Sequence, residues 1–567
     1  MQSAHGSTEN YRGGTVPSST HGQNGGATPQ KDFDVIVVGA GFAGLYAVHK
    51  YRNIEGLAVL GLDAATDVGG TWYWNRYPGA RCDVESYNYS YSFDPELVQD
   101  WNWSERFAGQ PEILRYLNHV ADRYDLRRSY MFEKQVSSGT FDEERNRWVI
   151  ETKDGDTYTA QFLHSGVGFL SAAKEPAFEG LQDFTGNVYR TSHWPHEGVD
   201  FAGRRVAVIG TGSSGIQLIP LVAQEAGALT VFQRTPNYAT PLGNGVMDPE
   251  FQAQIKANHA TLIERSRRTY AGIPYDTAQP SAVAVSDEER VATFEEKWRQ
   301  GGFRLCFDSF ADLAFNPESN ELAAEFIRAK IRQRVTDPAV ADLLTPRDHP
   351  YATKRPPLET NYYETYNREN VELIDLRATP IVRITENGIQ AGDVEYEFDD
   401  IILATGFDAL TGPLLRMNLR GRGGLPLAEH WEQGARTYFG RMINQFPNLV
   451  MALGPQSPSA LYSIPFAVQD TADWTADLIR HMRENGLETV EPTAEAEDGW
   501  DRQTREIASY TLLPQANSWY MGANIPGKPR ACLVYLGGGP AYNELIDKAT
   551  ANGYEGFELR AAAPAIP

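Results

Sequence analysis

The sequence contains few cysteines and no closely spaced pair of them. Its 567 residues include three, Cys82, Cys306 and Cys532, which lie far apart in the chain. Without a C-x-x-C pair, the sequence offers neither a redox dithiol nor a cysteine-based zinc site, and we expect no bound metal. Three isolated thiols fit a reducing compartment, so we expect a cytoplasmic protein.

Long apolar runs and an excess of positive charge are also missing. No stretch reaches the roughly 18–20 apolar residues that span a bilayer. Lys and Arg together number 51 against 74 Asp and Glu, a formal net charge of -23. Such a charge repels phosphate backbones and anionic lipids, so we expect neither a nucleic-acid nor a membrane partner. The apolar share of 41% nevertheless indicates a folded globular protein.

Two segments share one strand–turn–helix pattern. Residues 33–38 and 205–210 are short apolar runs of the kind that form strands buried on both faces, and each leads through a glycine-rich turn into a helical stretch. In this context the glycines permit the tight turn, the approach of a pyrophosphate and close helix packing. The sequence therefore predicts two dinucleotide-binding units. Their motif glycines are Gly39, Gly41 and Gly44 in the first unit and Gly210, Gly212 and Gly215 in the second.

The second strand of each unit ends in a different charge. Asp63 stands at this place in the first unit, and Arg234 stands there in the second. A carboxylate accepts hydrogen bonds from a ribose 2′-hydroxyl, whereas an arginine binds a 2′-phosphate. We therefore predict FAD in the first unit, NADPH in the second, and an α/β fold with two Rossmann-like domains.

Between these units and the C-terminus the pattern changes twice. Residues 247–342 show helical periodicity with charged faces, Ser286–Glu289 has the form of a capping box, and Asn320 is predicted to cap the helix that contains residues 326–331. This region is interpreted as a helical insertion in the NADP domain, after which strand character returns. The polar residues at the N-terminus, without an apolar signal core, are interpreted as a flexible tail. The predicted order is a tail (1–31), FAD domain (32–170), linker and NADP domain (171–246), helical insertion (247–342), NADP domain (343–400), FAD domain (401–560) and a second tail (561–567).

Longer motifs carry a resemblance to a known family. They are residues 69–83, 110–115, 353–355, 404–409 and 518–530, the first reading Gly-Gly-Thr-Trp-Tyr-Trp-Asn-Arg-Tyr-Pro-Gly-Ala-Arg-Cys-Asp. In these motifs the sequence resembles the type I Baeyer–Villiger monooxygenases, from about residue 33 to about residue 559. The resemblance implies an enzyme that uses FAD, NADPH and molecular oxygen to turn a ketone into an ester or lactone. In that family a C4a-peroxyflavin attacks the carbonyl to form a Criegee intermediate, and the enzymes act as monomers.

The same resemblance implies roles for individual residues. Arg355 matches the arginine that stabilises the peroxide anion, and Asp83 matches the aspartate that orients it; a fixed guanidinium in a water-poor pocket is a strong electrostatic device. Trp519 is expected on a mobile loop that closes over the cofactor. The other expected contacts are Gly70, Thr71, Trp72 and Tyr89 at the flavin; Gly212, Ser213, Ser214 and Gln217 at the NADP pyrophosphate; and Arg234, Thr235 and Lys354 at the 2′-phosphate.

The sequence departs from the family pattern at two places. In the fingerprint F-x-G-x-x-x-H-x-x-x-W-[P/D], Arg190 stands at the histidine position, and we expect it to tune the coupling between the two domains. The matching fingerprint residues are Phe184, Gly186, Trp194 and Pro195. The expected substrate side also differs, which suggests a specialised, bulky or cyclic ketone such as a steroid, terpenoid or polyketide intermediate. The residues expected on the substrate side are Phe169, Ser459, Ala460, Leu461 and Tyr462.

Three other functions stay open at this point. A flavin-dependent enzyme with the same cofactors can oxygenate sulfur or nitrogen instead of a ketone. A flavin-binding protein that has lost oxygenation would serve as a binding component. An NADPH oxidase would release hydrogen peroxide whatever substrate is present.

Overall fold

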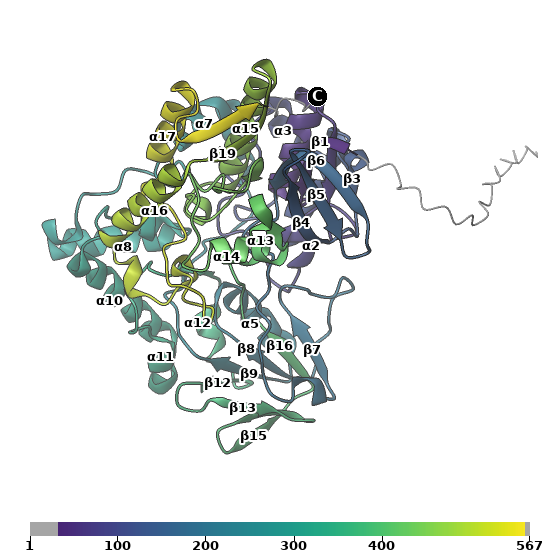
Figure 1. The fold of residues 1–567 in the computed structure, drawn as a ribbon. Coiled ribbons are helices and arrows are strands. Elements are labelled where there is room, and N and C mark those ends of the chain that lie inside the picture. Colours follow the sequence, from purple (N-terminus) through teal and green to yellow (C-terminus); the bar gives the residue numbers. More distant parts are fainter. Residues whose placement is uncertain (1–31, 562–567) are drawn as a thin grey trace, which may run out of the picture.

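The structure of this protein, a computed structural model, describes residues 32–561. The tail predicted at 1–31 lies outside the described residues, as does the second tail except for Ala561, which ends the last strand. The described chain builds one sheet-centred lobe at the top of Figure 1 and another at the bottom. The predicted α/β fold with two Rossmann-like domains and a helical insertion is confirmed.

Eight strands form the first sheet. They are β1 (Asp32–Val38), β2 (Val59–Leu62), β3 (Tyr130–Met131), β4 (Val136–Asp142), β5 (Arg147–Thr152), β6 (Thr157–Ser165), β17 (Leu419–Arg420) and β18 (Leu449–Met451). β1 lies between β2 and β6, and both pair with it in parallel. Because β1 is covered on both faces, Val35, Ile36 and Val37 are fully buried, as the continuous apolar run predicted.

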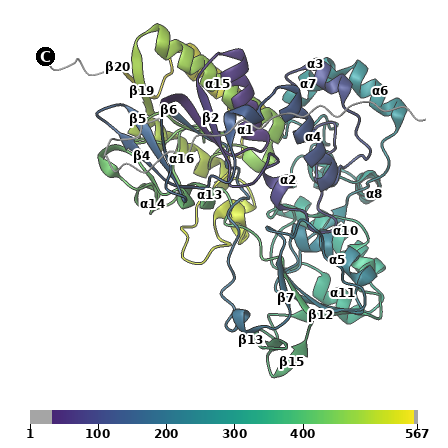
Figure 2. The same cartoon turned by 90° about the vertical axis from the view of Figure 1, so that its right-hand side faces the viewer.

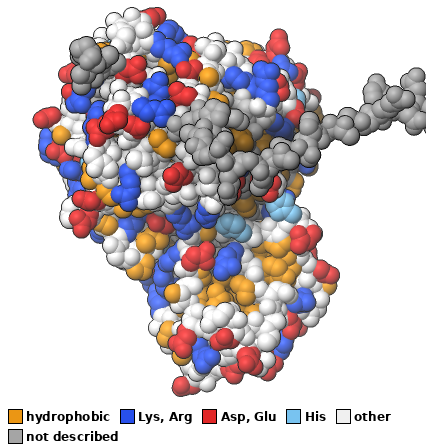
Figure 3. All heavy atoms as spheres, turned by 45° about the vertical axis from the view of Figure 1, so that its right-hand side comes forward, with side chains coloured by type: hydrophobic (Ala, Val, Ile, Leu, Met, Phe, Trp, Pro, Cys, Tyr) orange, Lys and Arg blue, Asp and Glu red, His pale blue; other side chains and the backbone are white. Residues whose placement is uncertain are grey.

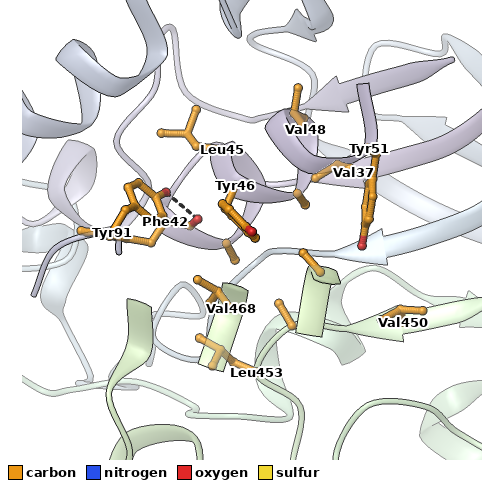
Figure 4. Close-up of a cluster of buried hydrophobic side chains, with 14 of the residues drawn as sticks. Val37, Phe42, Leu45, Tyr46, Val48, Tyr51, Tyr91, Val450, Leu453 and Val468 are labelled. Atoms are coloured by element: carbon orange, nitrogen blue, oxygen red, sulfur yellow. Dashed lines mark hydrogen bonds between the residues drawn. The ribbon is translucent and has the colours of Figure 1, made fainter. Parts of the chain in front are cut away.

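Helices cover this sheet and hold its first glycine turn in place. They are α1 (Phe42–Val48), its π-helical continuation η1 (His49–Ile54), α2 (Thr71–Trp74), α3 (Pro95–Asp100), α4 (Gln110–Arg123), α13 (Gly412–Arg416), α14 (Leu427–His430), α15 (Ile464–Glu484), α16 (Ala494–Ser509) and α17 (Gly539–Ala551), with β19 (Leu487–Pro492) and β20 (Phe557–Ala561) beside them. Figure 4 shows Phe42, Leu45 and Tyr46 of α1 in one cluster with Val468 of α15. The Tyr91 hydroxyl donates to the Phe42 carbonyl (2.7 Å), so the cluster also fixes the start of α1.

The second sheet has five parallel strands in the order β12-β9-β8-β16-β7. Their bounds are β7 (Asn187–Arg190), β8 (Arg205–Ile209), β9 (Ala228–Gln233), β12 (Val371–Asp375) and β16 (Asp400–Leu403). The domain boundary predicted between residues 400 and 401 is wrong, because it divides β16, which pairs with β8 and β7. The chain therefore returns to the first lobe only after Leu403. Helix α5 (Ser213–Glu225) connects β8 to β9.

The helical insertion contains α6 (Pro249–Ala257), α7 (His259–Arg267), α8 (Asp287–Gln300), α9 (Arg304–Phe307), α10 (Pro317–Arg334) and α11 (Pro338–Leu344). Ser286 caps α8 by accepting the Glu289 N–H, as predicted. The prediction for Asn320 is wrong: Asn316 caps α10, and Asn320 lies within that helix. There its buried amide donates to the carbonyls of Leu313 and Tyr351, so it holds a loop instead of starting a helix.

Short elements complete the second lobe. They are β10 (Thr240–Pro241), β11 (Leu358–Glu359), α12 (Tyr362–Thr365), and a separate sheet of β13 (Ile381–Ile384), β14 (Gly388–Ala391) and β15 (Val394–Glu397), which the sequence reading did not foresee.

Two segments cross between the lobes, and they pair with each other (Figure 2). We call residues 166–186 the first linker and residues 404–411 the second linker. The Lys174 N–H donates to the Gly406 carbonyl (3.0 Å), and the Asp408 N–H donates to the Ala172 carbonyl (2.9 Å). A change in one linker is therefore transmitted directly to the other. Within residues 32–561, no helix is long and apolar enough to cross a bilayer.

Candidate active site

A cleft of about 1600 Å³ lies between the two sheets. It opens at the carboxyl ends of β1, β2, β8, β9 and β16, where residues that follow each strand line it. This is the edge at which open parallel sheets bind ligands. Figure 3 shows the waist between the lobes, where Lys, Arg and His side chains gather on the displayed face.

The first glycine turn leaves no room for side chains. Gly39 has φ +110°, and a Cβ there would lie 2.4 Å from the Gly166 carbonyl oxygen. A Cβ on Gly44 would lie 1.7 Å from the Gly39 oxygen, and one on Gly41 would meet Gly70 at 3.3 Å. Gly70 itself has φ +53°. The first glycine turn and the loop at Gly70 therefore both present backbone without side chains to the cleft. This leaves room for a flat or extended ligand.

Asp63 is tied to this turn. One carboxylate oxygen accepts the Ala40 N–H (2.6 Å) and the other accepts the Ala65 N–H (2.7 Å). Burial raises the pKa of Asp63 although both backbone hydrogen bonds oppose it. The carboxylate thus holds the turn in shape while lining the cleft. Its bond to a ribose hydroxyl stays a prediction.

The wall beside the first turn is built by the motif that begins at Gly69. Gly70, Thr71, Trp72 and Tyr89 all line the cleft. The Trp72 indole N–H donates to the Tyr89 hydroxyl (3.2 Å), and the Trp72 carbonyl accepts from the Gln110 side chain. The residues expected around the flavin therefore come together and hold one another.

Arg355 and Asp83 form a two-bond ion pair in the cleft. Nε of Arg355 donates to Oδ2 of Asp83 (2.7 Å) and Nη2 donates to Oδ1 (2.9 Å). The remaining Nη1 donates to the Ala460 carbonyl (2.6 Å), and the guanidinium lies over the Phe303 ring at 4.6 Å. Burial disfavours the charged guanidinium, but the Asp83 carboxylate outweighs it and raises the pKa of Arg355. The site therefore holds one permanently charged, oriented donor.

The second glycine turn, like the first, has no room for side chains at its first and last glycines. Gly210 has φ +114°, and a Cβ there would lie 2.4 Å from the Ala404 oxygen. A Cβ on Gly215 would lie 2.2 Å from the Gly210 oxygen, whereas a Cβ on Gly212 would meet nothing within 4 Å. Ser213 and Ser214 begin α5 at the cleft.

Gln217, which is expected at the NADP pyrophosphate, also makes hydrogen bonds to the first domain. Its side-chain oxygen accepts from the Tyr77 hydroxyl (2.9 Å), and its amide donates to the Arg81 carbonyl (3.2 Å). Gln217 lines the cleft and at the same time joins α5 to a loop of the first domain.

Arg234, Thr235 and Lys354 all line the cleft. Burial, opposed by Asp348 and aided by the charge of Arg234, lowers the pKa of Lys354. The sequence reading missed Lys174, which lines the cleft from the first linker. Burial and then Arg234 lower its pKa as well. Because it belongs to no motif, no local signal marked it.

Trp519 and Phe169 meet at the cleft. Trp519 begins a short 3-10 helix (Trp519–Met521), and its ring stacks on Phe169 with centroids 6.1 Å apart and planes 13° apart. Farther along this loop, Asn524 donates to the Phe407 carbonyl and Lys528 pairs with Asp408 (2.6 Å). The loop that carries Trp519 is therefore attached to the second linker.

The fingerprint residues surround the entry of β7. A Cβ on Gly186 would lie 2.4 Å from the Asp399 oxygen. Phe184 is buried, Trp194 packs on Tyr189, and the Pro195 carbonyl accepts from Gly198. These contacts fix the joint between the first linker and the second sheet.

Arg190 ends β7, and its Nη2 lies 3.5 Å from Oε2 of Glu175 in the first linker. The neighbouring His193 packs on Trp74 with ring centroids 5.2 Å apart. The arginine at the fingerprint position therefore links β7 to the linker electrostatically.

The expected substrate side is mostly apolar. Ala460, Leu461 and Tyr462 line the cleft, whereas Ser459 is fully buried beneath them and is not among the lining residues. The Tyr462 ring fits against two glycines, because a Cβ would approach it within 2.8 Å at Gly272 and 2.1 Å at Gly539.

The comparisons with known proteins agree with this geometry. The pyridine nucleotide-disulphide oxidoreductase family matches residues 36–278. A Baeyer-Villiger monooxygenase of Pseudooceanicola batsensis is 47% identical over 92% of this chain and 95% of its own length. The phenazine N-monooxygenase PhzNO1 of Lysobacter antibioticus is 41% identical over 93% of this chain and 96% of its own length.

Solved structures match as closely. An oxidized steroid monooxygenase bound to NADP is 50% identical, covers 94% of this chain and 100% of its own, and has a TM-score of 0.89. The OTEMO complex with FAD and NADP is 42% identical with the same coverage and a TM-score of 0.90.

Proposed function

The chain belongs to the Baeyer–Villiger monooxygenase family, and we propose that it uses FAD, NADPH and dioxygen to oxidise a ketone to an ester or lactone. One observation carries the proposal beyond family membership. Arg355, held by the two hydrogen bonds that it donates to Asp83, places a fixed positive charge in the cleft that both glycine turns line.

The residues present fit both cofactors. The bare backbone at Gly39, Gly41 and Gly70 leaves space where a dinucleotide and a flat ring system would lie. At the second turn, Gly212 faces open space and the cations Arg234 and Lys354 stand near it in the cleft. An anionic phosphate suits that end, and an uncharged ribose suits the end at Asp63.

Bound FAD, reduced by NADPH, supplies the oxygen-activating chemistry. Around it, Arg355 stabilises negative charge that develops on oxygen near its guanidinium, and its charge persists at every working pH. Asp83 fixes the plane of that guanidinium. Trp519 and Phe169 cover the cleft with stacked apolar surface, which excludes water.

The test is product formation by the FAD-loaded protein with NADPH, isotopically labelled dioxygen and a ketone. We expect one labelled oxygen atom in each ester and one NADPH consumed for each ester formed. NADPH use that is independent of the ketone, with matching hydrogen peroxide, would show an oxidase instead. Flavin binding without any NADPH use would show a non-catalytic binding protein.

For the substrate we propose a neutral, bulky or cyclic ketone. Phe303, whose ring lies under Arg355, lines the cleft together with the apolar residues Phe307, Ile273, Leu461 and Tyr462. This surface favours apolar bodies and disfavours charged ones. We expect the ratio kcat/KM to rise from acetone to cyclohexanone to a polycyclic ketone. A preference for acetone over both cyclic ketones would contradict this assignment.

Oxygenation of nitrogen or sulfur is the second candidate, because a similar relative is described as a phenazine N-monooxygenase. Competition between a ketone and a sulfide or N-heteroaromatic in one reaction separates the two functions. We expect the ester to be the main product; a dominant sulfoxide or N-oxide would assign the second function.

A further inference from the structure

Within residues 32–561, four cations that line the cleft form no ion pair with a carboxylate, and one of them, Arg416, donates to the Ala173 carbonyl instead. In the same range, no carboxylate lies within 4 Å of Lys174, Arg234 or Lys354, although the chain carries 74 acidic residues. Other cations of the same cleft are neutralised: Arg355 pairs with Asp83, and Lys134 with Asp154 and Asp156. Asp348 acts on Lys354 from beyond ion-pair distance, but an acidic protein that leaves several cations of one cleft without an ion pair is suited to receive an anion there.

The three cations come from different parts of the fold. Arg234 follows β9, Lys354 precedes Arg355, and Lys174 belongs to the first linker. All three line the cleft. The charge of Arg234 reaches both lysines, since it contributes, after burial, to the lowered pKa of each. Arg234 therefore repels both protonated lysines in the folded protein. An anion that binds among the three positive charges would reduce this repulsion.

Lys174 is held in position by its backbone. Its N–H donates to the Gly406 carbonyl (3.0 Å) and its carbonyl accepts from the Thr405 hydroxyl (3.5 Å). Among residues 32–561, its Nζ donates only to the Asn524 carbonyl, at 3.4 Å. A single long bond to a neutral carbonyl leaves most of the ammonium's donor capacity free.

We propose that Lys174 is a third cation of the site that receives the 2′-phosphate of NADPH, and that it contributes to selecting NADPH over NADH. This rests on the proposed function. A phosphomonoester carries between about -1.5 and -2 charges at pH 7 and three acceptor oxygens, so three cationic donors match its oxygens in number and more than neutralise its charge. Because Nζ also contacts the carbonyl of Asn524, the same lysine joins the phosphate site to the loop that carries Trp519.

The test is calorimetric binding to the FAD-loaded protein, with NADP⁺, NAD⁺ and adenosine 2′,5′-bisphosphate as separate probes. We expect Lys174→Gln to weaken binding of NADP⁺ and the bisphosphate about tenfold, the size of one charge-assisted hydrogen bond. Its affinity for NAD⁺ should stay unchanged, and Lys174→Arg should keep most of the affinity for NADP⁺. The matched control is Lys153→Gln, since Lys153 is exposed on the surface away from the cleft.

The outcomes separate this inference from the proposed function. Equal NADP⁺ affinity in Lys174→Gln and the unchanged protein would overturn the role of Lys174. An equal loss for NADP⁺ and NAD⁺ would also overturn it, because the lysine would then act on the fold and not on the phosphate. If the unchanged protein bound NAD⁺ as tightly as NADP⁺, the NADPH assignment of the proposed function would fail instead.

Discussion

A single guanidinium carries most of the chemical argument. Arg355 uses three of its nitrogen atoms on Asp83 and Ala460, so its plane is fixed before any ligand arrives. A charge that needs no reorientation stabilises developing negative charge more effectively than a mobile one. The rate of ester formation should therefore depend strongly on this residue.

Removing this charge gives the first prediction. In Arg355→Ala, ester formation should fall by roughly 100–1000-fold, the usual effect of losing one preorganised donor. Asp83→Asn should cost less, since the charge remains and only its orientation is weakened. Gas chromatography of the ester measures both variants. Ester formation within twofold of the unchanged rate in Arg355→Ala would refute the role of this residue.

The lowered lysine pKa values give a prediction about pH. Lys354 and Lys174 lose their protons at a lower pH than an ordinary lysine, so positive charge at the phosphate site declines earlier as the pH rises. A phosphomonoester loses its second charge below about pH 6. NADP⁺ affinity should therefore pass through a maximum and fall on both sides.

NAD⁺, which has no 2′-phosphate, is the control in the same titration. Calorimetry from pH 5.5 to about pH 10 should show a nearly flat profile for NAD⁺ in regions where that of NADP⁺ falls. Parallel profiles for the two cofactors would show that the lysines do not act through the phosphate.

At the scale of elements, the joint between β7 and the first linker differs from the family pattern. Arg190 ends β7 and faces Glu175 across 3.5 Å, with 38% and 68% of the two side chains exposed. A pair this exposed contributes only about 0–1 kcal/mol to stability. Its effect is therefore expected in the movement between the lobes and not in folding.

A double-mutant cycle tests this joint. Arg190→His and Glu175→Gln should each raise the fraction of NADPH that ends as hydrogen peroxide, and the double variant should be no worse than either single one, because both remove one interaction. Melting temperatures should stay nearly unchanged. If Arg190→His altered neither the flavin reduction rate nor the peroxide released, the idea that Arg190 tunes coupling would be wrong.

Local sequence signals predict the boundary of a helix or strand correctly where the interactions that fix it are also local. The capping serine at Ser286 was recognisable because its bond to Glu289 lies within one turn. Asn320 was misjudged because its partners, Leu313 and Tyr351, are tertiary, and Asn316 with the following Pro317 is the better start. The boundary at 400 failed for a similar reason, since only strand pairing places β16 in the second sheet.

On the scale of the whole molecule, one of the contacts between the two nucleotide-binding domains is a tight backbone approach. Gly79 has φ +82°, and a Cβ there would lie 2.6 Å from the Gln217 carbonyl oxygen of α5. The Tyr77 hydroxyl bonds the same residue. At this contact the backbones of the two domains meet without an intervening side chain.

Gly79→Ala should push residue 79 and the Gln217 carbonyl apart. Gly203→Ala is the matched control. Gly203 also has a positive φ (+71°), but a Cβ there meets nothing within 4 Å, so it isolates the backbone strain of about 1–2 kcal/mol. The clash at Gly79 adds about 1–3 kcal/mol. Gly79→Ala should therefore melt roughly 1–3 °C lower than Gly203→Ala.

Scanning calorimetry compares the two variants, and NADP⁺ titration shows whether α5 has moved. We expect weaker NADP⁺ binding in Gly79→Ala alone. Equal melting temperatures and equal NADP⁺ affinities in the two variants would mean that the contact at Gly79 accommodates a Cβ without loss of stability or binding.

The sequence by itself determined the parts whose physics is local. Apolar runs indicate buried strands, and glycines indicate tight turns. Asp63 in the first unit and Arg234 in the second distinguish two ribose environments. The long motifs identified the family and, through it, Arg355 and Asp83. None of these signals depends on residues distant in the chain except by resemblance.

Only the tertiary structure decided which distant residues share a site. Arg355 and Asp83 are 272 positions apart, and Lys174, Arg234 and Lys354 reach one cleft from separate parts of the chain. Ser459 is buried and does not line the cleft, and Gln217 is bound to the opposite domain. Contacts of this kind depend on how sheets and linkers pack, and packing leaves no periodic mark in the sequence.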